Sequence, residues 1–449
     1  IRDDCSSRGL GDVYKRQSKS LPVPKGRISR ASSFGKLAIK FASSIVFDGT
    51  KELLGGRSPS IKNLLAQEKN ILTFIEELAK LRGAALKIGQ LLSLEANDFL
   101  PEQVSKMLGD LRNKNFHMPN YQLGEVLREN YGDDFLDIFS EFNETPIAAA
   151  SIGQVHKCKY GNKELILKIQ YPKIRESIES DINNIRLVTK NLGILPKSFD
   201  FDKLLEAGKT QLLNETDYLL EAAHQKNFHR LLKTDKKFVV PKINKKLTTT
   251  KILAMEYHNG ITIDQVAHHD QKTKNSIINN LVELAFKEIF EFNLIQTDPN
   301  FANFLFDDKS KKIVLLDFGA TSKVSKKNIQ VFKDILNGLA LDRKEMVEKA
   351  LITLKIFSPN ASNSVKQYLL DIIWNLSLPL RKNKEFDFLN CISTEDLNLL
   401  SSTLINQKDK FQLPDPQILF IQRKLGGIFL LGRKFGARKN FSKLVTKYI

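Results

Sequence analysis

Four polar residues of this 449-residue chain have the types and the order that a phosphoryl-transfer site requires. Such a site needs a cation for the α/β-phosphates, an acid that positions the nucleophile, and oxygen ligands for Mg²⁺. The chain offers these types in this order: Lys168, then Asp298 and Asn303, then Asp317. The chemistry depends on the elements that position these side chains.

Each of the four residues lies in a sequence context that resembles a protein kinase. Lys168 ends the run Leu165-Ile166-Leu167-Lys168, which is similar to the Val-Ala-Ile-Lys strand of kinases. Asp298 and Asn303 are five residues apart, the spacing of the kinase catalytic-loop Asp and its Mg²⁺-binding Asn. Asp317-Phe318-Gly319 follows an apolar strand. A buried lysine needs a counter-charge in any fold, so each signal alone is weak, but the ordered combination favours a kinase-like site.

The predicted elements give a small β-rich lobe followed by a mostly helical lobe, joined near 257–260. Alternating and turn-bounded segments predict the strands, and apolar residues at helical spacing predict the helices. The first 125 or so residues read as helical, including an amphipathic helix over 33–47. The later elements are a β-hairpin over 155–170, a long helix over 201–232, strands over 238–240 and 252–257, an apolar helix over 275–292, strands over 303–306 and 313–316, and helices over 325–449.

The composition restricts the kinds of partner that this chain is expected to bind. Lys and Arg number 69 against 51 Asp and Glu, a net charge of +18, which suits an anionic partner or a solvated lysine-rich surface equally well. No zinc-finger, RNA-binding or helix-turn-helix pattern accompanies the charge, so we expect no nucleic-acid partner. Three isolated cysteines argue for a reducing compartment, and no apolar run is long enough to predict a membrane span. The helix over 33–47 could dock on the fold's own core or lie on an anionic membrane surface.

The segment before Lys168 departs from ordinary kinases. A kinase covers the phosphates with a glycine-rich loop, because glycine lets the backbone approach closely. Here the loop carries Ala148, Ala149, Ala150 and Ser151. The alanine methyl groups restrict the backbone, so we expect the phosphates to be held differently.

Further motifs resemble the UbiB family of atypical kinase-like proteins. Lys87-Ile88-Gly89-Gln90 is similar to the family's Lys-x-Gly-Gln motif, the Ala-rich loop to its nucleotide loop, and Glu215-Thr216-Asp217 to its Glu-x-Asp motif. The segment 296–304 resembles the branch with the mitochondrial coenzyme Q kinase-like proteins and their bacterial relatives. The resemblance covers roughly residues 25 to 440.

The resemblance implies a bilobal protein-kinase-like α+β fold, mostly helical, with an N-terminal helical extension packed on the active site. We expect a disordered tail over 1–24, of which 1–17 resembles a spurious peptide, an extension over 25–125, an N-lobe over 126–257 and a C-lobe over 258–449. The implied roles are as follows: Lys168, Glu221 and Asp298 catalytic; Ala148, Ala149, Ala150, Ser151, Glu256 and Tyr257 in nucleotide binding; Asn303 and Asp317 on Mg²⁺ and nucleotide; Lys87, Gln90, Glu215 and Asp217 regulatory. Whether Glu215 or Glu221 pairs with Lys168 stays open.

The implied function is an atypical kinase or ATPase that binds Mg²⁺-ATP and supports ubiquinone biosynthesis. Its partners would be ATP or ADP, an anionic lipid surface, and enzymes or quinone precursors of that pathway. The location would be peripheral at the inner membrane, on the cytoplasmic side in a bacterium or the matrix side in a mitochondrion. The Lys-x-Gly-Gln segment disfavours protein phosphorylation in trans. The alternatives are a pseudokinase scaffold or lipid-precursor chaperone and, below these, a small-molecule kinase.

Overall fold

The computed structural model describes residues 20–24, 29–30, 117–150, 152–192, 201–298, 300–354, 362–391 and 416–449, and six single positions between 32 and 83. The chain forms two compact units, the first of residues 1–226 and 241–258 and the second of 227–240 and 259–449. Residues 227–240, which were predicted within the N-lobe, therefore group with the second unit. Of the predicted helix over 33–47, the described Gly35, Lys36, Ile39 and Ser43 are helical and exposed; its apolar positions Phe34, Leu37, Phe41 and Ile45 lie outside the described residues.

An antiparallel sheet forms the centre of the first unit, in the order β1-β3-β4-β6 with β2 also paired to β3. The predicted hairpin is its middle, and Gly161 at the turn has φ +57°, a left-handed conformation without cost for glycine. Side chains alternate along β4, so the buried Leu167 and Ile169 face the core and Lys168 faces the other side. The strands are β1 (Glu141–Phe142), β2 (Ala148–Ala149), β3 (Gly153–Tyr160), β4 (Lys163–Gln170) and β6 (Ile252–Glu256).

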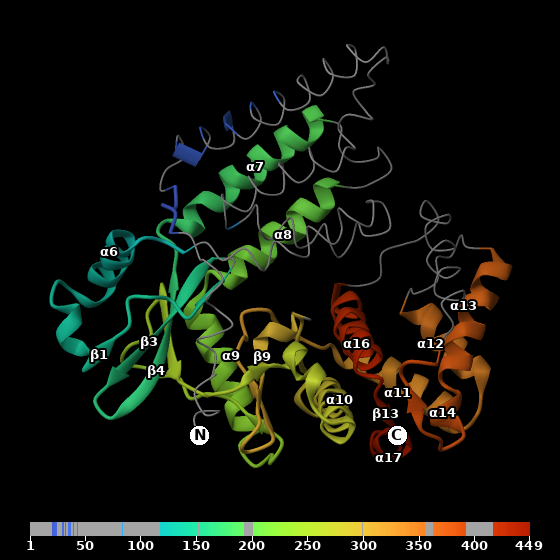
Figure 1. Cartoon of the computed structure of the whole chain (residues 1–449). Helices are drawn as coiled ribbons and strands as arrows, with labels where there is room; N and C mark the ends of the chain where they lie inside the picture. The colour runs from blue at the N-terminus through green and yellow to red at the C-terminus, as the bar shows by residue number, and fades with distance from the viewer. Residues whose placement is uncertain are drawn as a thin grey trace, which may run out of the picture. The chain divides into compact units, whose positions relative to one another are not determined.

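The helices of the first unit differ from the prediction at two points. The single helix expected over 201–232 is wrong, because it breaks into two at 216–217. The carboxylate of Asp217 accepts a hydrogen bond from the N–H of Leu220 at 2.9 Å, the geometry of an N-cap that starts a new helix. The helix α7 was not predicted and lies beside α8 (Figure 1). The bounds are α6 (Asn120–Tyr131), the 3₁₀ turn η2 (Phe135–Ile138), α7 (Ile174–Leu192), α8 (Phe201–Glu215) and α9 (Tyr218–Leu231).

The second unit contains a four-stranded sheet in the order β5-β10-β9-β7, in which β5 runs parallel to β10. A separate pair, β8 and β11, lies at the ends of the two loops that carry Asp298 and Asp317. The strands predicted at 238–240, 303–306 and 313–316 correspond to β5, β9 and β10. The bounds are β5 (Phe238–Val239), β7 (Ile261–Thr262), β8 (Leu294–Gln296), β9 (Phe304–Asp307), β10 (Lys312–Leu315) and β11 (Thr321–Lys323).

The apolar helix predicted over 275–292 is α10 (Gln271–Lys287) followed by a single π turn, η4 (Glu288–Phe292). The N–H of Asn293 donates to the carbonyl of Glu288, five residues earlier, and Asn293 itself is left-handed with φ +54°. Strand β8 begins at the next residue. π-helical turns are rare and frequently occur at functional sites.

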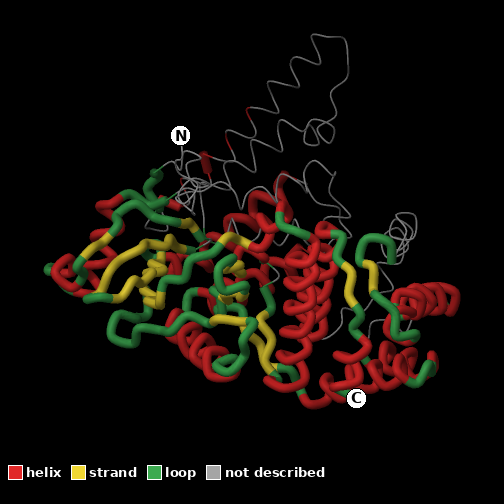
Figure 2. Tube along the Cα trace, turned by 60° about the horizontal axis from the view of Figure 1, so that its bottom comes forward, coloured by secondary structure: helices red, strands yellow, loops and turns green. Residues whose placement is uncertain are grey.

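The part of the second unit around the C-terminus is mostly helix (Figure 2). Ile277, Ile278, Leu281 and Leu284 of α10 are buried and pack with α16 residues such as Ile428 and Leu431. None of the helices that the structure describes has the length and apolar character of a membrane span. The remaining elements are η3 (Ile263–His268), η5 (Phe301–Asn303), α11 (Lys326–Ala340), α12 (Lys344–Thr353), α13 (Asn363–Leu376), α14 (Leu378–Arg381), β12 (Phe386–Asp387), α16 (Pro416–Phe435), β13 (Arg438–Lys439) and α17 (Ser442–Lys447).

Candidate functional site

In the first unit, Lys168 of β4 forms an ion pair with Glu221 of α9. The ammonium Nζ lies 3.0 Å from each carboxylate oxygen of Glu221. The Glu221 side chain is fully buried, and that of Lys168 is 13% exposed. The Lys168 ammonium also lies 5.2 Å from the centre of the Tyr218 ring, a cation–π distance. The lysine is therefore fixed in a single direction from the sheet.

The carboxylate that pairs with Lys168 is thus that of Glu221, and the helix break explains the choice. Glu215 ends α8, and its carboxylate accepts a hydrogen bond from Gln211 at 3.1 Å. Asp217 caps the following helix α9 through the N–H of Leu220 and so starts α9 one turn before Glu221. Glu215 and Glu221 therefore belong to different helices, a separation that a continuous helical pattern could not show.

The Ala-rich segment forms a tight hairpin onto β3. Ala148 and Ala149 pair with Val155 and Gln154, and the N–H of Ala150 donates to the carbonyl of Gly153 at 2.8 Å. A Cβ atom at Gly153 would lie 2.3 Å from the carbonyl oxygen of Ile169, so only glycine fits there. The segment is therefore fixed strand rather than a loose loop; Ser151 lies outside the described residues.

The predicted adenine contacts, Glu256 and Tyr257, lie at the end of β6. The N–H of Glu256 donates to the carbonyl of Lys242 at 2.9 Å, and the N–H of Tyr257 donates to that of Glu164 at 3.1 Å. Both N–H groups are therefore already used in hydrogen bonds within the first unit. A backbone donor for adenine would have to come from the residues that follow.

In the second unit, Asp298 and Asn303 are joined directly. The Asn303 side-chain amide donates to Asp298 Oδ2 at 2.9 Å, and the N–H of Asn300 donates to Asp298 Oδ1 at 3.1 Å. Because the nitrogen of the Asn303 amide is turned to Asp298, its oxygen faces away and can accept a cation. Carboxylate and amide oxygens are the ligands that Mg²⁺ prefers, so this donor set fits the metal.

Asp317 lies next to this pair through the backbone. The N–H of Leu316 donates to the carbonyl of Asn303 at 3.0 Å, and Asp317 Oδ1 accepts from the N–H of Gly319 at 2.9 Å. Phe318 is buried, and its ring centre lies 4.9 Å from that of Phe228 at the end of α9. The Asp-Phe-Gly segment is thus anchored by the Leu316 hydrogen bond before its aspartate, and by the aromatic contact and the tight turn after it.

Two residues that the sequence analysis did not select hold these loops together. Gln296 Nε2 donates to the carbonyl oxygen of Asp317 at 2.9 Å. The N–H and hydroxyl of Thr297 both donate to the carbonyl of Ala320, at 2.7 and 2.8 Å. The signal was available, since two polar residues directly precede Asp298 and are buried here.

Some predicted residues take no part in this geometry. Lys87 and Gln90 lie outside the described residues. Within the described ranges, no group of three or more His, Cys, Asp or Glu side chains could hold a metal alone.

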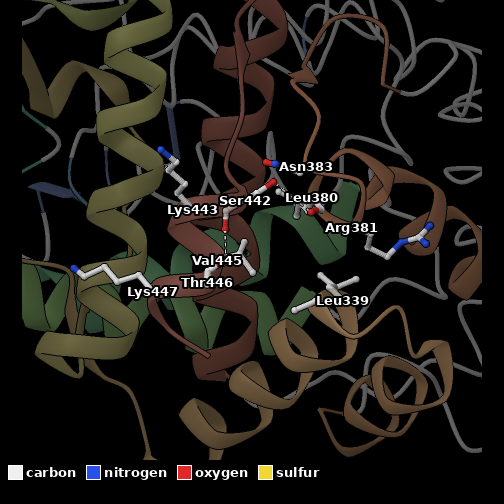
Figure 3. Close-up of a pocket in the computed structure, with 10 residues that line it drawn as sticks. Leu339, Leu380, Arg381, Asn383, Ser442, Lys443, Val445, Thr446 and Lys447 are labelled. Atoms are coloured by element: carbon white, nitrogen blue, oxygen red, sulfur yellow. Dashed lines mark hydrogen bonds between the residues drawn. The ribbon is translucent and has the colours of Figure 1, made fainter.

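A pocket of about 570 Å³ in the second unit is separate from all predicted site residues. Leu339, Leu380 and Val445 form its apolar part, with Ser442 and Thr446 beside them. The charged ends of Arg381, Lys443 and Lys447 point away from it (Figure 3). The pocket therefore offers no concentrated charge to an anionic ligand.

Comparison with known proteins finds a matching family domain and similar sequences. Residues 110–350, more than half of the chain, match the ABC1 atypical kinase-like domain. The chain is 36% identical over 431 residues to atypical kinase COQ8, mitochondrial, of Saccharomyces cerevisiae, covering 95% of this chain and 85% of the relative. It is 34% identical over 437 residues to atypical kinase COQ8B, mitochondrial, of Danio rerio, covering 96% and 70%.

A solved structure supports the fold. The complex of Rv3197 with erythromycin from Mycobacterium tuberculosis has a TM-score of 0.59 and 22% identity, covering 83% of this chain and 93% of that chain. At this identity the likeness speaks for the fold alone. Together with the matched domain, it confirms the predicted kinase-like α+β fold.

Proposed function

This chain belongs to the ABC1 atypical kinase-like family, as its resemblance to UbiB proteins indicated, and from that membership we propose that it binds Mg²⁺-ATP and transfers or hydrolyses its γ-phosphoryl group in support of ubiquinone biosynthesis. The observation that carries the proposal is the Lys168–Glu221 pair, with Nζ 3.0 Å from both carboxylate oxygens. A buried lysine fixed by a carboxylate is the phosphate-holding cation of kinase-like sites.

In the first unit, Lys168 would bind the α/β-phosphates while Glu221 keeps it charged and oriented. The Ala-rich hairpin, Ala148 to Ser151, would cover the phosphates, and the segment at Glu256 and Tyr257 would contact adenine. The Lys-x-Gly-Gln motif, Lys87 to Gln90, would restrict protein substrates together with Glu215 and Asp217.

In the second unit, Asp298 would orient the acceptor hydroxyl or water and take its proton as the bond to the γ-phosphorus forms. The bond between that phosphorus and the β-phosphate oxygen breaks, leaving ADP. Asn303 and Asp317 would hold Mg²⁺, which when bound neutralises the developing phosphate charge. The Gln296 bond to the backbone carbonyl of Asp317 would hold the segment that carries this carboxylate.

The test of nucleotide binding is a thermal melting shift with ADP or ATP, with and without Mg²⁺, since a ligand that binds only the folded state stabilises it. We expect a Mg²⁺-dependent shift for the wild type, none for Asp317→Asn, and a normal one for Asp308→Asn, whose carboxylate lies on the exposed turn before β10. A wild type without any nucleotide shift would contradict the proposal. A normal shift without phosphoryl transfer or hydrolysis would favour the pseudokinase scaffold.

We also propose that this chain attaches peripherally to an anionic membrane surface. The membrane would be the inner membrane, on the side where quinone precursors are processed. The support is the +18 charge together with the mitochondrial relatives. Pelleting with cardiolipin-containing vesicles should exceed pelleting with neutral vesicles and weaken with salt.

Quinone profiling of a knockout complemented with wild type or Asp317→Asn tests the pathway.

A further inference from the structure

Beneath the loop that carries Asp298, two oppositely charged side chains are buried against each other. Glu288 begins the π turn η4, and Lys424 lies on α16, 136 residues later. The Lys424 ammonium donates to Glu288 Oε2, and the two side chains are only 5% and 1% exposed. Burying two charges is costly, so such a pair is weak evidence for stability alone.

The Glu288 carboxylate makes a second contact that leads to the site. The backbone N–H of Gln296 also donates to it. The side chain of the same residue then donates to the carbonyl of Asp317 at 2.9 Å. A continuous set of hydrogen bonds thus runs from Lys424 through Glu288 and Gln296 to Asp317.

One face of α16 contacts this region. Gln417 Oε1 accepts from the N–H of Ser325 at 3.1 Å and from the Asn328 amide at 3.1 Å. One turn later, Ile421 is fully buried against Ile289, Ile295 and Val324. Lys424 follows on the same face, because residues three and four apart are neighbours on a helix. This helix lies beyond residues 110–350, the part that matches the family domain.

The charges of the pair depend on each other. Burial raises the pKa of Glu288 and lowers that of Lys424, while each side chain opposes the shift of the other. Removing either partner alone would leave an uncompensated buried charge. A test of the pair must therefore replace both.

We propose that Lys424 and Glu288 are positioning residues for the proposed phosphoryl-transfer site: they fix Gln296, and Gln296 fixes the backbone of the metal-binding Asp317. The inference deepens the proposed function and rests on it for the role of Asp317. Helix α16 thereby helps to position the site rather than only covering it.

The test uses the full chain with two double variants. Glu288→Met/Lys424→Met removes both charges at similar volume and also removes the acceptor for the Gln296 N–H. Glu288→Gln/Lys424→Met removes both charges but keeps an acceptor oxygen. The matched control is Asp235→Asn/Lys287→Met, since Lys287 neighbours Glu288 in the chain but pairs with Asp235.

Two readouts separate positioning from simple support. The first is the Mg²⁺ concentration that half-saturates ADP binding, which we expect to rise about tenfold in the Met/Met variant and less than about twofold in the Gln/Met variant and the control. The second is amide hydrogen exchange without nucleotide; of the three double variants, only Met/Met is expected to exchange faster over 294–298 and 317–321. Gln296→Met, which keeps the pair but breaks the bond to Asp317, should also raise the Mg²⁺ requirement and speed exchange over 317–321.

Each result has one meaning. Unchanged exchange over 294–298 and 317–321 in the Met/Met variant overturns the inference, whatever the nucleotide data show. If the Met/Met variant does not melt cooperatively, Gln296→Met decides, and normal exchange with a normal Mg²⁺ requirement overturns the inference. A wild type that binds no Mg²⁺-ADP contradicts the proposed function, and the exchange data then still decide whether the pair positions the loop.

Discussion

In the first unit the side chain of interest is a lysine that forms an ion pair with a carboxylate from the same unit, whereas in the second unit acidic side chains accept hydrogen bonds from neutral amides. Lys168 is neutralised by Glu221 at 3.0 Å. Asp298 accepts from the N–H of Asn300 and the amide of Asn303, and Asp317 accepts from the N–H of Gly319. Neutral donors orient a carboxylate without cancelling its charge, and Asp298 and Asn303 together offer oxygen ligands to a cation.

This difference predicts that the first unit depends on its ion pair for stability. Lys168→Met removes the ammonium that lies 3.0 Å from the fully buried Glu221 carboxylate, and we expect a loss of about 3–5 kcal/mol in the free energy of unfolding. Lys168→Met/Glu221→Met should recover most of that stability but not nucleotide binding. Urea unfolding, followed by hydrogen exchange in β3 and β4, measures the effect.

The control is Lys159→Met on the same hairpin, where the ion pair with Glu141 is exposed and screened by water. We expect it to leave unfolding unchanged. Equal losses for Lys159→Met and Lys168→Met would show that burial does not distinguish the two pairs.

The first unit should also respond to pH through His156. Burial lowers the pKa of this imidazole to about 4. The Nδ1 hydrogen bond to the Asn143 carbonyl raises the pKa and so opposes burial, whereas the nearby His117 lowers it further. The folded state therefore keeps His156 neutral while the unfolded chain, with a pKa near 6.5, takes up a proton. Stability from this group is present above about pH 6.5 and is lost as the pH falls towards 4.

His156→Gln removes that dependence, since an amide can donate to Asn143 and accept from Gln154 without titrating. Between pH 7 and pH 5 the wild type should lose about 2 kcal/mol relative to this variant. Unfolding free energies at the two pH values measure it. A constant difference between the two proteins would mean that the pKa of His156 is the same in the folded and the unfolded chain.

The second unit can be tested by adding charge where a neutral amide now lies. Asn303→Asp places a second carboxylate against Asp298, and like charges in contact raise the pKa of one of them. We expect a loss of about 1.5 kcal/mol without metal and a larger Mg²⁺-induced melting shift than in the wild type. Shifts of equal size for both proteins would place Mg²⁺ away from Asn303.

The smallest expected effect concerns the Ala-rich hairpin of the first unit. Ala149→Gly frees the backbone next to the turn, and we expect nucleotide affinity or autophosphorylation to change by roughly tenfold, about 1.4 kcal/mol. Lys87→His should release activity in the same direction by loosening the Lys-x-Gly-Gln segment. Radiolabel transfer from γ-labelled ATP measures both, with Asp317→Asn as the blank. If the variants bind Mg²⁺-ATP but transfer no more label than Asp317→Asn, the hairpin does not restrain phosphoryl transfer.

The sequence predicted those features that depend on local pattern. The alternation around Lys168 and the turn at Gly161 predicted the hairpin, whereas the hydrogen bond between Asp298 and Asn303 was not predicted from their spacing. The break at Asp217 was not predicted, because an apolar stripe continues across it and the capping bond is a single side chain. Nor could any pattern connect Glu288 with Lys424, because their contact depends on how α16 packs against α10.

The π turn at Glu288–Phe292 restricts insertions and deletions in this part of the chain. It accommodates one more residue per turn than an α-helix, and the chain leaves it through Asn293 directly into β8. Deleting one residue here would restore regular helix and rotate everything that follows by about 100°. Gln296 and Asp298 would then both lose their hydrogen-bond partners. Insertions and deletions between α10 and β8 should therefore be among the least tolerated in a deep mutational scan, even where single substitutions are accepted.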